Sequence, residues 1–120
     1  IERAGLRLKP GVNVEVVDPE KWVPDGYVCI RVDSRGAGRS PGTIDIWSLQ
    51  EAMDLAQCVE WAGVQRWSNG KVGLNGISYY AENQWQCASL QPKHLAAICT
   101  WEDRAPEPLP SSTRQPSSFA

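Results

Sequence analysis

Short apolar runs and amphipathic stretches follow one another along most of this chain. The apolar runs are bounded by turn residues, which predicts buried strands over 27–32, 71–76 and 95–101. The stretches between them repeat apolar residues every three or four positions, which predicts helices over 46–64 and from Ser78 to about Gln91. Strands that alternate with helices form parallel sheets with crossover connections. The sequence therefore predicts an α/β fold with about three parallel strands and crossover helices.

Each long predicted helix carries an apolar stripe. On the first helix the stripe consists of Leu49, Ala52, Met53, Ala56 and Val59. On the second helix it consists of Ala81, Trp85 and Ala88. A short helix is also predicted after Asp18, because Asp18 can cap it and Pro19 suits its first position.

The two ends of the chain differ from its middle. Residues 1–17 form an ambiguous lead-in, because "VNVEVV" alternates like a strand but follows a Pro-Gly pair. Residues 103–120 are rich in Pro and Ser with little to bury, which predicts a disordered tail. One partial domain is therefore expected over 18–102. The chain begins with Ile1 rather than Met, so its true N-terminus is expected to be missing.

Composition narrows the class of protein. The 120 residues are 42% hydrophobic, which allows a packed core, and the net charge is −2. This charge gives no reason to expect nucleic acid or a membrane surface as a partner. No apolar run approaches the roughly 20 residues that span a bilayer.

The four cysteines lie in apolar or helical stretches and form no C-x-x-C pair; they are Cys29, Cys58, Cys87 and Cys99. His94 is the only histidine, so no Cys/His metal spacing exists and no metal or cofactor is expected. These cysteines are therefore expected to be buried free thiols. Free thiols slightly favour a reducing compartment such as the cytoplasm.

Ser78 sits in the more informative of two Gly-x-Ser triplets. Gly38-Arg39-Ser40 is followed by Pro41, so no helix begins there. Gly76-Ile77-Ser78 lies between a predicted strand and a predicted helix, which is the context of a nucleophile elbow. The usual motif has glycine two positions after the serine, where this chain has Tyr80. A helix-capping serine explains the triplet about as well.

A longer set of motifs resembles the cocaine esterase (CocE/NonD) and X-Pro dipeptidyl-peptidase-like family of α/β-hydrolases, over roughly residues 18–102. The Asp-x-Arg-Gly-x-Gly-x-Ser pattern of that family matches Asp33, Arg35, Gly36, Gly38 and Ser40. Its Trp-Ser-Asn-Gly turn matches residues 67–70. Its elbow and following helix match Gly76, Ser78, Tyr79, Gln84 and Trp85.

The resemblance implies a serine hydrolase that cleaves small ester or peptide-like substrates through an acyl-enzyme. Ser78 would be the nucleophile, and the N–H of Tyr79 would be one oxyanion donor. The triad order implies an acid and a histidine after Ser78. His94 is about a dozen helical residues away, roughly 18 Å at 1.5 Å per residue, and is not expected to be the base. No match to the family's second oxyanion donor, an upstream tyrosine, is found. The chain is therefore expected to be a fragment that is inactive alone.

The family's strand order also implies a pairing. Residues 71–76 should pair in parallel with 95–100. A further strand separates 27–32 from 71–76 in that order. Residues 27–32 are therefore expected either to stand one strand away from 71–76 or to pair with it directly.

Other polar and aromatic residues have structural roles as their first interpretation. Asp33 is expected to brace its loop, Arg35 to make structural hydrogen bonds and Arg39 to face solvent. Core packing is the default for three aromatic residues that could instead line an acyl pocket: Tyr80, Trp85 and Trp101. Glu102 follows a strand end, and a place beside the active site is the lesser alternative for it.

Two other classes of function compete with the hydrolase hypothesis. One is a non-catalytic truncated product or interaction module that binds a partner through exposed apolar surface. The other is a nucleotide-binding domain that uses the Gly-rich loop after Val32. This loop lacks the Gly-x-Gly-x-x-Gly spacing and a phosphate-binding lysine, which argues against nucleotide.

Overall fold

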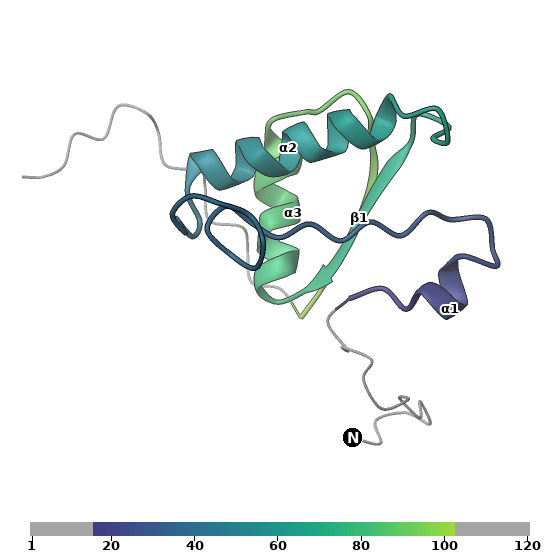
Figure 1. The fold of residues 1–120 in the computed structure, drawn as a ribbon, viewed down its shortest axis with the longest axis horizontal. Helices are drawn as coiled ribbons and strands as arrows, with labels where there is room; N and C mark the ends of the chain where they lie inside the picture. The colour runs from purple at the N-terminus through teal and green to yellow at the C-terminus, as the bar shows by residue number, and fades with distance from the viewer. Residues whose placement is uncertain (1–15, 103–120) are drawn as a thin grey trace, which may run out of the picture. The chain divides into compact units, whose positions relative to one another are not determined.

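The computed structural model describes residues 16–102 (Figure 1). Contacts divide the chain into two compact units that separate between Arg31 and Val32. The predicted tail over 103–120, and all but two residues of the predicted lead-in over 1–17, lie outside the described residues.

The first unit contains the short helix α1, Pro19–Trp22. The Asp18 carboxylate accepts a hydrogen bond from the N–H of Glu20 at 3.0 Å, and Pro19 occupies the first helical position. The Trp22 and Tyr27 rings then pack edge to face, with centroids 5.1 Å apart. The predicted helix start is confirmed, because capping and the fixed φ of proline act locally.

Residues 27–32 do not form the predicted strand. A strand exists only where its N–H and C=O groups pair with a neighbour, and the sheet within residues 16–102 contains two other segments. Apolar side chains in this segment remain exposed, including Tyr27, Val28 and Ile30. Residues 27–31 and 71–76 belong to different units, so the expected arrangement of the two segments stays a prediction.

The second unit begins its regular structure with α2, Leu49–Gly63. Ser48 caps this helix by accepting a hydrogen bond from the N–H of Glu51 at 3.1 Å. The helix therefore starts three residues later than the 46 predicted from periodicity. Its buried face holds Ala52, Val59, Ala62 and Gly63. Met53, expected on the apolar stripe, is 42% exposed because it lies beside that face rather than on it.

A parallel strand pair with a crossover helix forms the centre of this unit (Figure 1). Strand β1, Val72–Ile77, is followed by α3, Tyr79–Ser89, and by strand β2, Leu95–Trp101. The register pairs Val72 with Leu95 and Ile77 with Trp101. The predicted parallel pairing and the α/β class are confirmed, although two of the three predicted strands form in residues 16–102.

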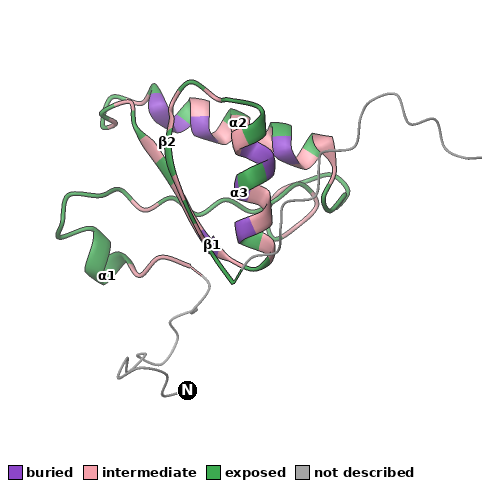
Figure 2. Ribbon diagram, turned by 180° about the vertical axis from the view of Figure 1, so that it is seen from behind, coloured by how far each residue is buried: buried purple, intermediate pink, exposed green. Residues whose placement is uncertain are grey.

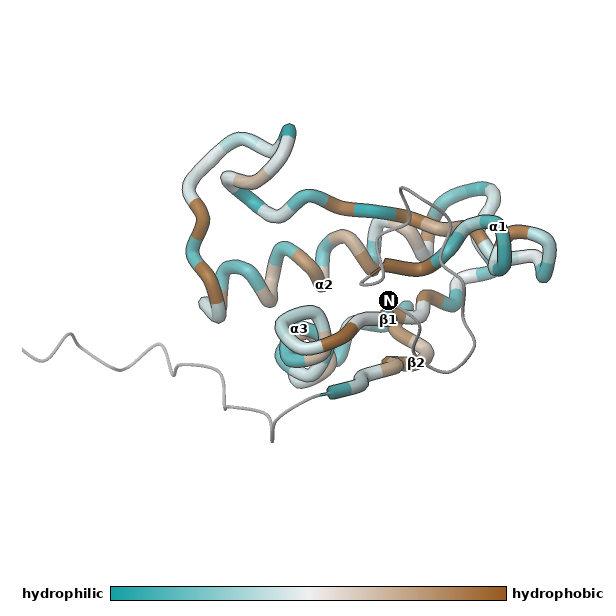
Figure 3. The backbone as a smooth tube through the Cα atoms, turned by 90° about the horizontal axis from the view of Figure 1, so that it is seen from below, coloured by the Kyte–Doolittle hydropathy of each residue, from teal (hydrophilic) through white to brown (hydrophobic). Residues whose placement is uncertain are grey.

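The two long helices pack against each other and against the strands. Helix α3 contacts both strands, and α2 contacts α3 and β1. Figure 3 looks along α3 and shows β1 and β2 side by side next to it. In Figure 2 the buried positions gather on α2 and α3. Within residues 16–102 the buried apolar residues are Ala52, Val59, Ala62, Ala81 and Cys87. Their mostly small side chains allow the two helices to approach closely.

Several residues predicted to be buried are exposed. All four cysteines are free thiols, and Cys87 is buried, but Cys99 is exposed on β2. Tyr80, Trp85 and Trp101 are 46%, 39% and 50% exposed, so the core-packing interpretation is wrong for these three residues. Periodicity identifies an apolar face but cannot say how completely it is covered, and within residues 16–102 these three side chains stay partly exposed. No helix within residues 16–102 is long and apolar enough to cross a bilayer.

Candidate active site

Ser78 occupies the bend between β1 and α3 in a backbone conformation that is unusual for serine. Its φ is 56° and its ψ is −119°. Residues other than glycine rarely adopt positive φ, because the Cβ crowds the backbone. The Ser78 side chain is exposed and makes no capping hydrogen bond to α3. The capping interpretation is therefore wrong, and the bend has the strained strand-to-helix geometry of an elbow.

The backbone around Ser78 is held on both sides. Its N–H donates to the carbonyl oxygen of Trp101 at 3.2 Å, which ties the bend to the end of β2. Its own carbonyl oxygen accepts from the N–H groups of Ala81 and Glu82 at 2.8 and 3.0 Å. These bonds hold the bend in place, and the exposed Ser78 side chain takes no part in capping the helix.

Gly76 explains why the bend can be so sharp. A Cβ added at Gly76 would overlap the Cβ of Tyr80 and lie 3.2 Å from the Tyr80 carbonyl carbon. The missing side chain at Gly76 therefore makes room for the first turn of α3. It also accommodates Tyr80, which stands where the usual motif has its second glycine.

Tyr79, the first residue of α3, is anchored through its side chain. Its N–H has no partner within the helix, as for the first residues of any α-helix. Its hydroxyl group lies 2.5 Å from both carboxylate oxygens of Glu51 on α2. The pKa of Tyr79 is raised to about 12. Partial burial is the larger cause, and the hydrogen bond to Glu51 is the second.

The raised pKa of Tyr79 predicts a stability change at high pH. The folded state favours the neutral phenol, so this contribution is present below pH 10 and is lost between 10 and about 12. The free energy of unfolding should therefore fall more steeply over this range in the wild type than in Tyr79→Phe. Urea denaturation at several pH values measures the difference. Equal slopes for the two proteins would contradict the prediction.

Sequence reasoning missed Glu51, which makes the contact from α2. Its carboxylate also accepts the N–H of Trp47 at 2.9 Å, and the Trp47 and Tyr79 ring centroids lie 5.6 Å apart. The pattern Ser48-x-x-Glu51 is that of a capping box, and it could have located this helix start. No local pattern indicated the bond to Tyr79.

Asp33 braces its loop, as expected. One carboxylate oxygen accepts the N–H of Arg39 at 3.0 Å, and the hydroxyl group of Ser40 donates to the Asp33 carbonyl oxygen at 2.8 Å. A Cβ at Gly38 would overlap the same carboxylate. The glycine therefore lets the loop close around Asp33.

Arg35 makes the expected structural hydrogen bonds, and its partner is Asp54. Two bonds of 2.8 and 2.7 Å join the guanidinium to the Asp54 carboxylate and fasten the loop to α2. The bond from Arg35 lowers the pKa of Asp54. Arg39 is exposed, as expected. Because α2 begins seven residues after Gly42, no helix N-terminus adjoins this loop to hold a phosphate.

His94 is at the opposite end of the strand pair from Ser78. It precedes β2, whereas Ser78 follows β1, and six paired residues at about 3.3 Å each separate the two ends by roughly 20 Å. The ring Nδ1 of His94 lies 2.8 Å from one carboxylate oxygen of Glu60, and the backbone N–H of His94 donates to the other oxygen at 3.0 Å. A Cβ at Gly63 would overlap the His94 ring. His94 therefore packs α2 against the start of β2 and does not reach Ser78.

Gln84 connects the bend to the neighbouring strand. The side chain is 2% exposed, and its amide group donates to the carbonyl oxygen of Tyr80 at 2.8 Å and, at 3.4 Å, to that of Gly76. Its amide oxygen accepts the N–H of Cys99 at 3.0 Å. A buried polar side chain is stable here because each of its polar atoms has a partner.

Gln84→Ala should lower the free energy of unfolding by about 2 kcal/mol, because it leaves inward-facing backbone groups without partners. Gln57→Ala, which truncates an exposed glutamine on α2, should change it by less than about 0.5 kcal/mol. Chemical denaturation of both variants compares them. Equal effects would show that Gln84 does not hold the bend to β2.

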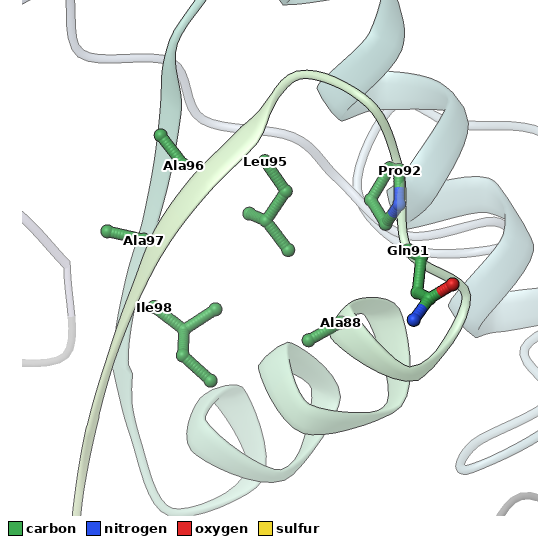
Figure 4. A pocket seen from close by; sticks show the side chains of 7 residues that line it. All are labelled: Ala88, Gln91, Pro92, Leu95, Ala96, Ala97 and Ile98. Carbon is green, nitrogen blue, oxygen red and sulfur yellow. The ribbon is translucent and has the colours of Figure 1, made fainter.

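Trp101 and Glu102 lie near the bend at Ser78, and a hollow in the surface lies away from it. Trp101 donates from its ring N–H to the Asn75 side-chain oxygen at 3.0 Å, and Glu102 follows it at the end of the sheet where Ser78 lies. An open hollow of about 390 Å³ lies between the C-terminal end of α3 and β2 (Figure 4). It is lined by Ala88, Gln91, Pro92, Leu95, Ala96, Ala97 and Ile98. No group of metal-ligating side chains occurs within 16–102.

The chain is similar to known hydrolases. The family model described as X-Pro dipeptidyl-peptidase (S15 family) matches residues 6–104. Cocaine esterase from Rhodococcus sp. (strain MB1 Bresler) is 34% identical over 78 residues, which cover 65% of this chain and 13% of the esterase. A crystal structure of a CocE/NonD family hydrolase from Staphylococcus aureus matches with a TM-score of 0.68 and 49% identity, over 70% of this chain and 15% of that one.

The chain thus spans about one seventh of the length of these relatives. The part matched by the family model, residues 6–104, includes both the Asp33 loop and the bend at Ser78. The structural match assigns the strand pair and its helices to part of an α/β-hydrolase-like fold. The family model covers well over half of the chain. The chain therefore belongs to the X-Pro dipeptidyl-peptidase (S15) family.

Proposed function

We propose that this chain carries the nucleophile segment of a serine hydrolase that cleaves ester or peptide-like amide bonds. Ser78 is the acyl nucleophile, and the N–H of Tyr79 is one oxyanion donor. The observation that carries the proposal is the positive φ of Ser78, with an exposed hydroxyl group that caps nothing. The names of the relatives, an esterase and a dipeptidyl-peptidase family, support the bond class.

The geometry supports a separate role in the reaction for the Ser78 oxygen and for the Tyr79 N–H. The Ser78 oxygen attacks a carbonyl carbon, and the displaced electron pair moves to the carbonyl oxygen. The resulting oxyanion accepts a hydrogen bond from the Tyr79 N–H at the positive end of the α3 dipole. The leaving group departs with a proton, and water then hydrolyses the acyl-serine. A base must take the serine proton, and His94 is held at the far end of the strands by Glu60.

The alternative is a non-catalytic product or interaction module. Exposed apolar side chains of the described residues favour it, for example the Trp61–Trp67 pair, whose members are 56% and 50% exposed. Exposure alone does not name a partner, and it leaves the strain at Ser78 without a purpose. The hydrolase proposal accounts for that strain.

Site-resolved labelling tests the proposal. At mildly alkaline pH, where hydroxide replaces the missing base, a fluorophosphonate should modify Ser78 at least about tenfold faster than the other serines. Ser48, Ser68 and Ser89 are internal controls, because their hydroxyl groups serve in local hydrogen bonds. Peptide mass spectrometry measures each rate. Equal labelling of all four serines would refute a nucleophilic role for Ser78.

A further inference from the structure

The first turn of α2 is connected to the first residue of α3 by a side-chain contact that helix capping does not explain. Glu51 accepts the Trp47 N–H, which supports its own helix start. It also accepts the hydroxyl group of Tyr79, which lies 28 residues further along the chain. A capping role accounts for the first bond alone.

The second bond holds Tyr79 from several sides. Its ring is half-buried and contacts the Trp47 ring at 5.6 Å and the Tyr80 ring at 6.0 Å between centroids. The backbone just before it is held by the bonds of the Ser78 carbonyl oxygen to α3 and of the Ser78 N–H to Trp101. With both its backbone and its ring tip held, Tyr79 has little freedom to rotate its N–H.

The direction of that N–H matters for catalysis. An oxyanion donor acts only if it lies about 2.7–3.1 Å from the developing charge, and a misplacement of about 1 Å can cost a hundredfold in rate. We propose that Glu51 is a positioning residue that holds the Tyr79 N–H in line for the oxyanion at Ser78. This inference rests on the proposed function, because it concerns the same bend.

Phenylboronic acid tests the inference without a catalytic base. The Ser78 oxygen bonds to the trigonal boron, its proton passes to solvent, and a boronate oxygen occupies the oxyanion position. Titration of uniformly ¹⁵N-labelled chain, followed through the amide signal of residue 79, gives the dissociation constant. The same signal should move downfield as its N–H donates to the boronate.

Glu51→Ala should weaken the boronate complex about tenfold and reduce the shift of the Tyr79 amide signal. Tyr79→Phe, which removes only the hydroxyl group, should do the same, and the double variant should lose no more than either single variant. Glu51→Gln should stay within about threefold of the wild type, because its amide oxygen still accepts from Tyr79 and Trp47.

Asp54→Ala is the matched control, since it removes another carboxylate from α2 that fastens a different loop. It should leave the boronate affinity within about twofold of the wild type. Unchanged affinity in Tyr79→Phe, or equal losses in Asp54→Ala and Glu51→Ala, would overturn the inference alone. A wild-type chain that binds phenylboronic acid no better than Ser78→Ala would overturn the proposed function, and the inference with it.

Discussion

The purified 120-residue chain should hydrolyse p-nitrophenyl acetate no faster than its Ser78→Ala variant. Serine is a poor nucleophile at neutral pH unless a base accepts its proton, and loss of triad members costs several powers of ten in rate. His94 is the only histidine of the chain, and it lies at the other end of the strand pair, bonded to Glu60. Release of p-nitrophenol, followed by absorbance, measures the rates.

Free imidazole provides a sharper version of this experiment. Because the one histidine of the chain does not reach Ser78, imidazole should increase acylation of Ser78 in the wild type, as detected by mass spectrometry. The Ser78→Ala variant corrects for hydrolysis by imidazole itself. Efficient turnover that depends on Ser78 without imidazole would contradict the expectation and would require a base elsewhere in the chain.

Gly76→Ala should lower the free energy of unfolding by about 3 kcal/mol, a large part of the stability of a small domain. The new methyl group would overlap the Cβ of Tyr80, which is fixed by the helix backbone and cannot rotate away. The start of α3 would have to move off β1, which would also displace the bend at Ser78. Denaturant midpoints measure the loss.

Gly73→Ala, on the same strand, is the control for this substitution. The nearest atom to a Cβ at Gly73 is the Ala97 carbonyl oxygen at 3.9 Å, an ordinary contact. Alanine makes the unfolded chain less flexible than glycine does. Gly73→Ala should therefore leave the free energy of unfolding unchanged or raise it by up to about 1 kcal/mol. Equal destabilisation by both substitutions would mean that the space at Gly76 is not what shapes the bend.

Features that depend on neighbouring residues could be predicted from the sequence. The Asp18 cap and the bend at Ser78 follow from short patterns of turn, cap and apolar residues, whereas the parallel pairing of β1 with β2 followed from the strand order of the family that the sequence resembles. The bracing of Asp33 followed from a family motif. The choice between a cap and an elbow at Ser78 was open in the sequence, because it depends on a dihedral angle.

Features that depend on distant partners could not be predicted in this way. Residues 27–32 have the composition of a strand, but a strand needs a neighbour, and composition does not supply one. The aromatic side chains of Tyr80, Trp85 and Trp101 would suit a buried core. Within residues 16–102 they stay partly exposed. The bond from Glu51 to Tyr79 joins two helices, and no local spacing encodes it.

The backbone at Ser78 has a consequence for protein engineering. A residue held in a sparsely populated region costs about 1–3 kcal/mol, and glycine at this position would relieve much of that cost. Under the proposed function, the chain keeps the less stable residue at the position where the reaction needs a hydroxyl group, a trade of stability for activity. Any redesign that ranks substitutions by folding energy alone would favour Ser78→Gly, and it would remove the proposed chemistry while improving the measured stability.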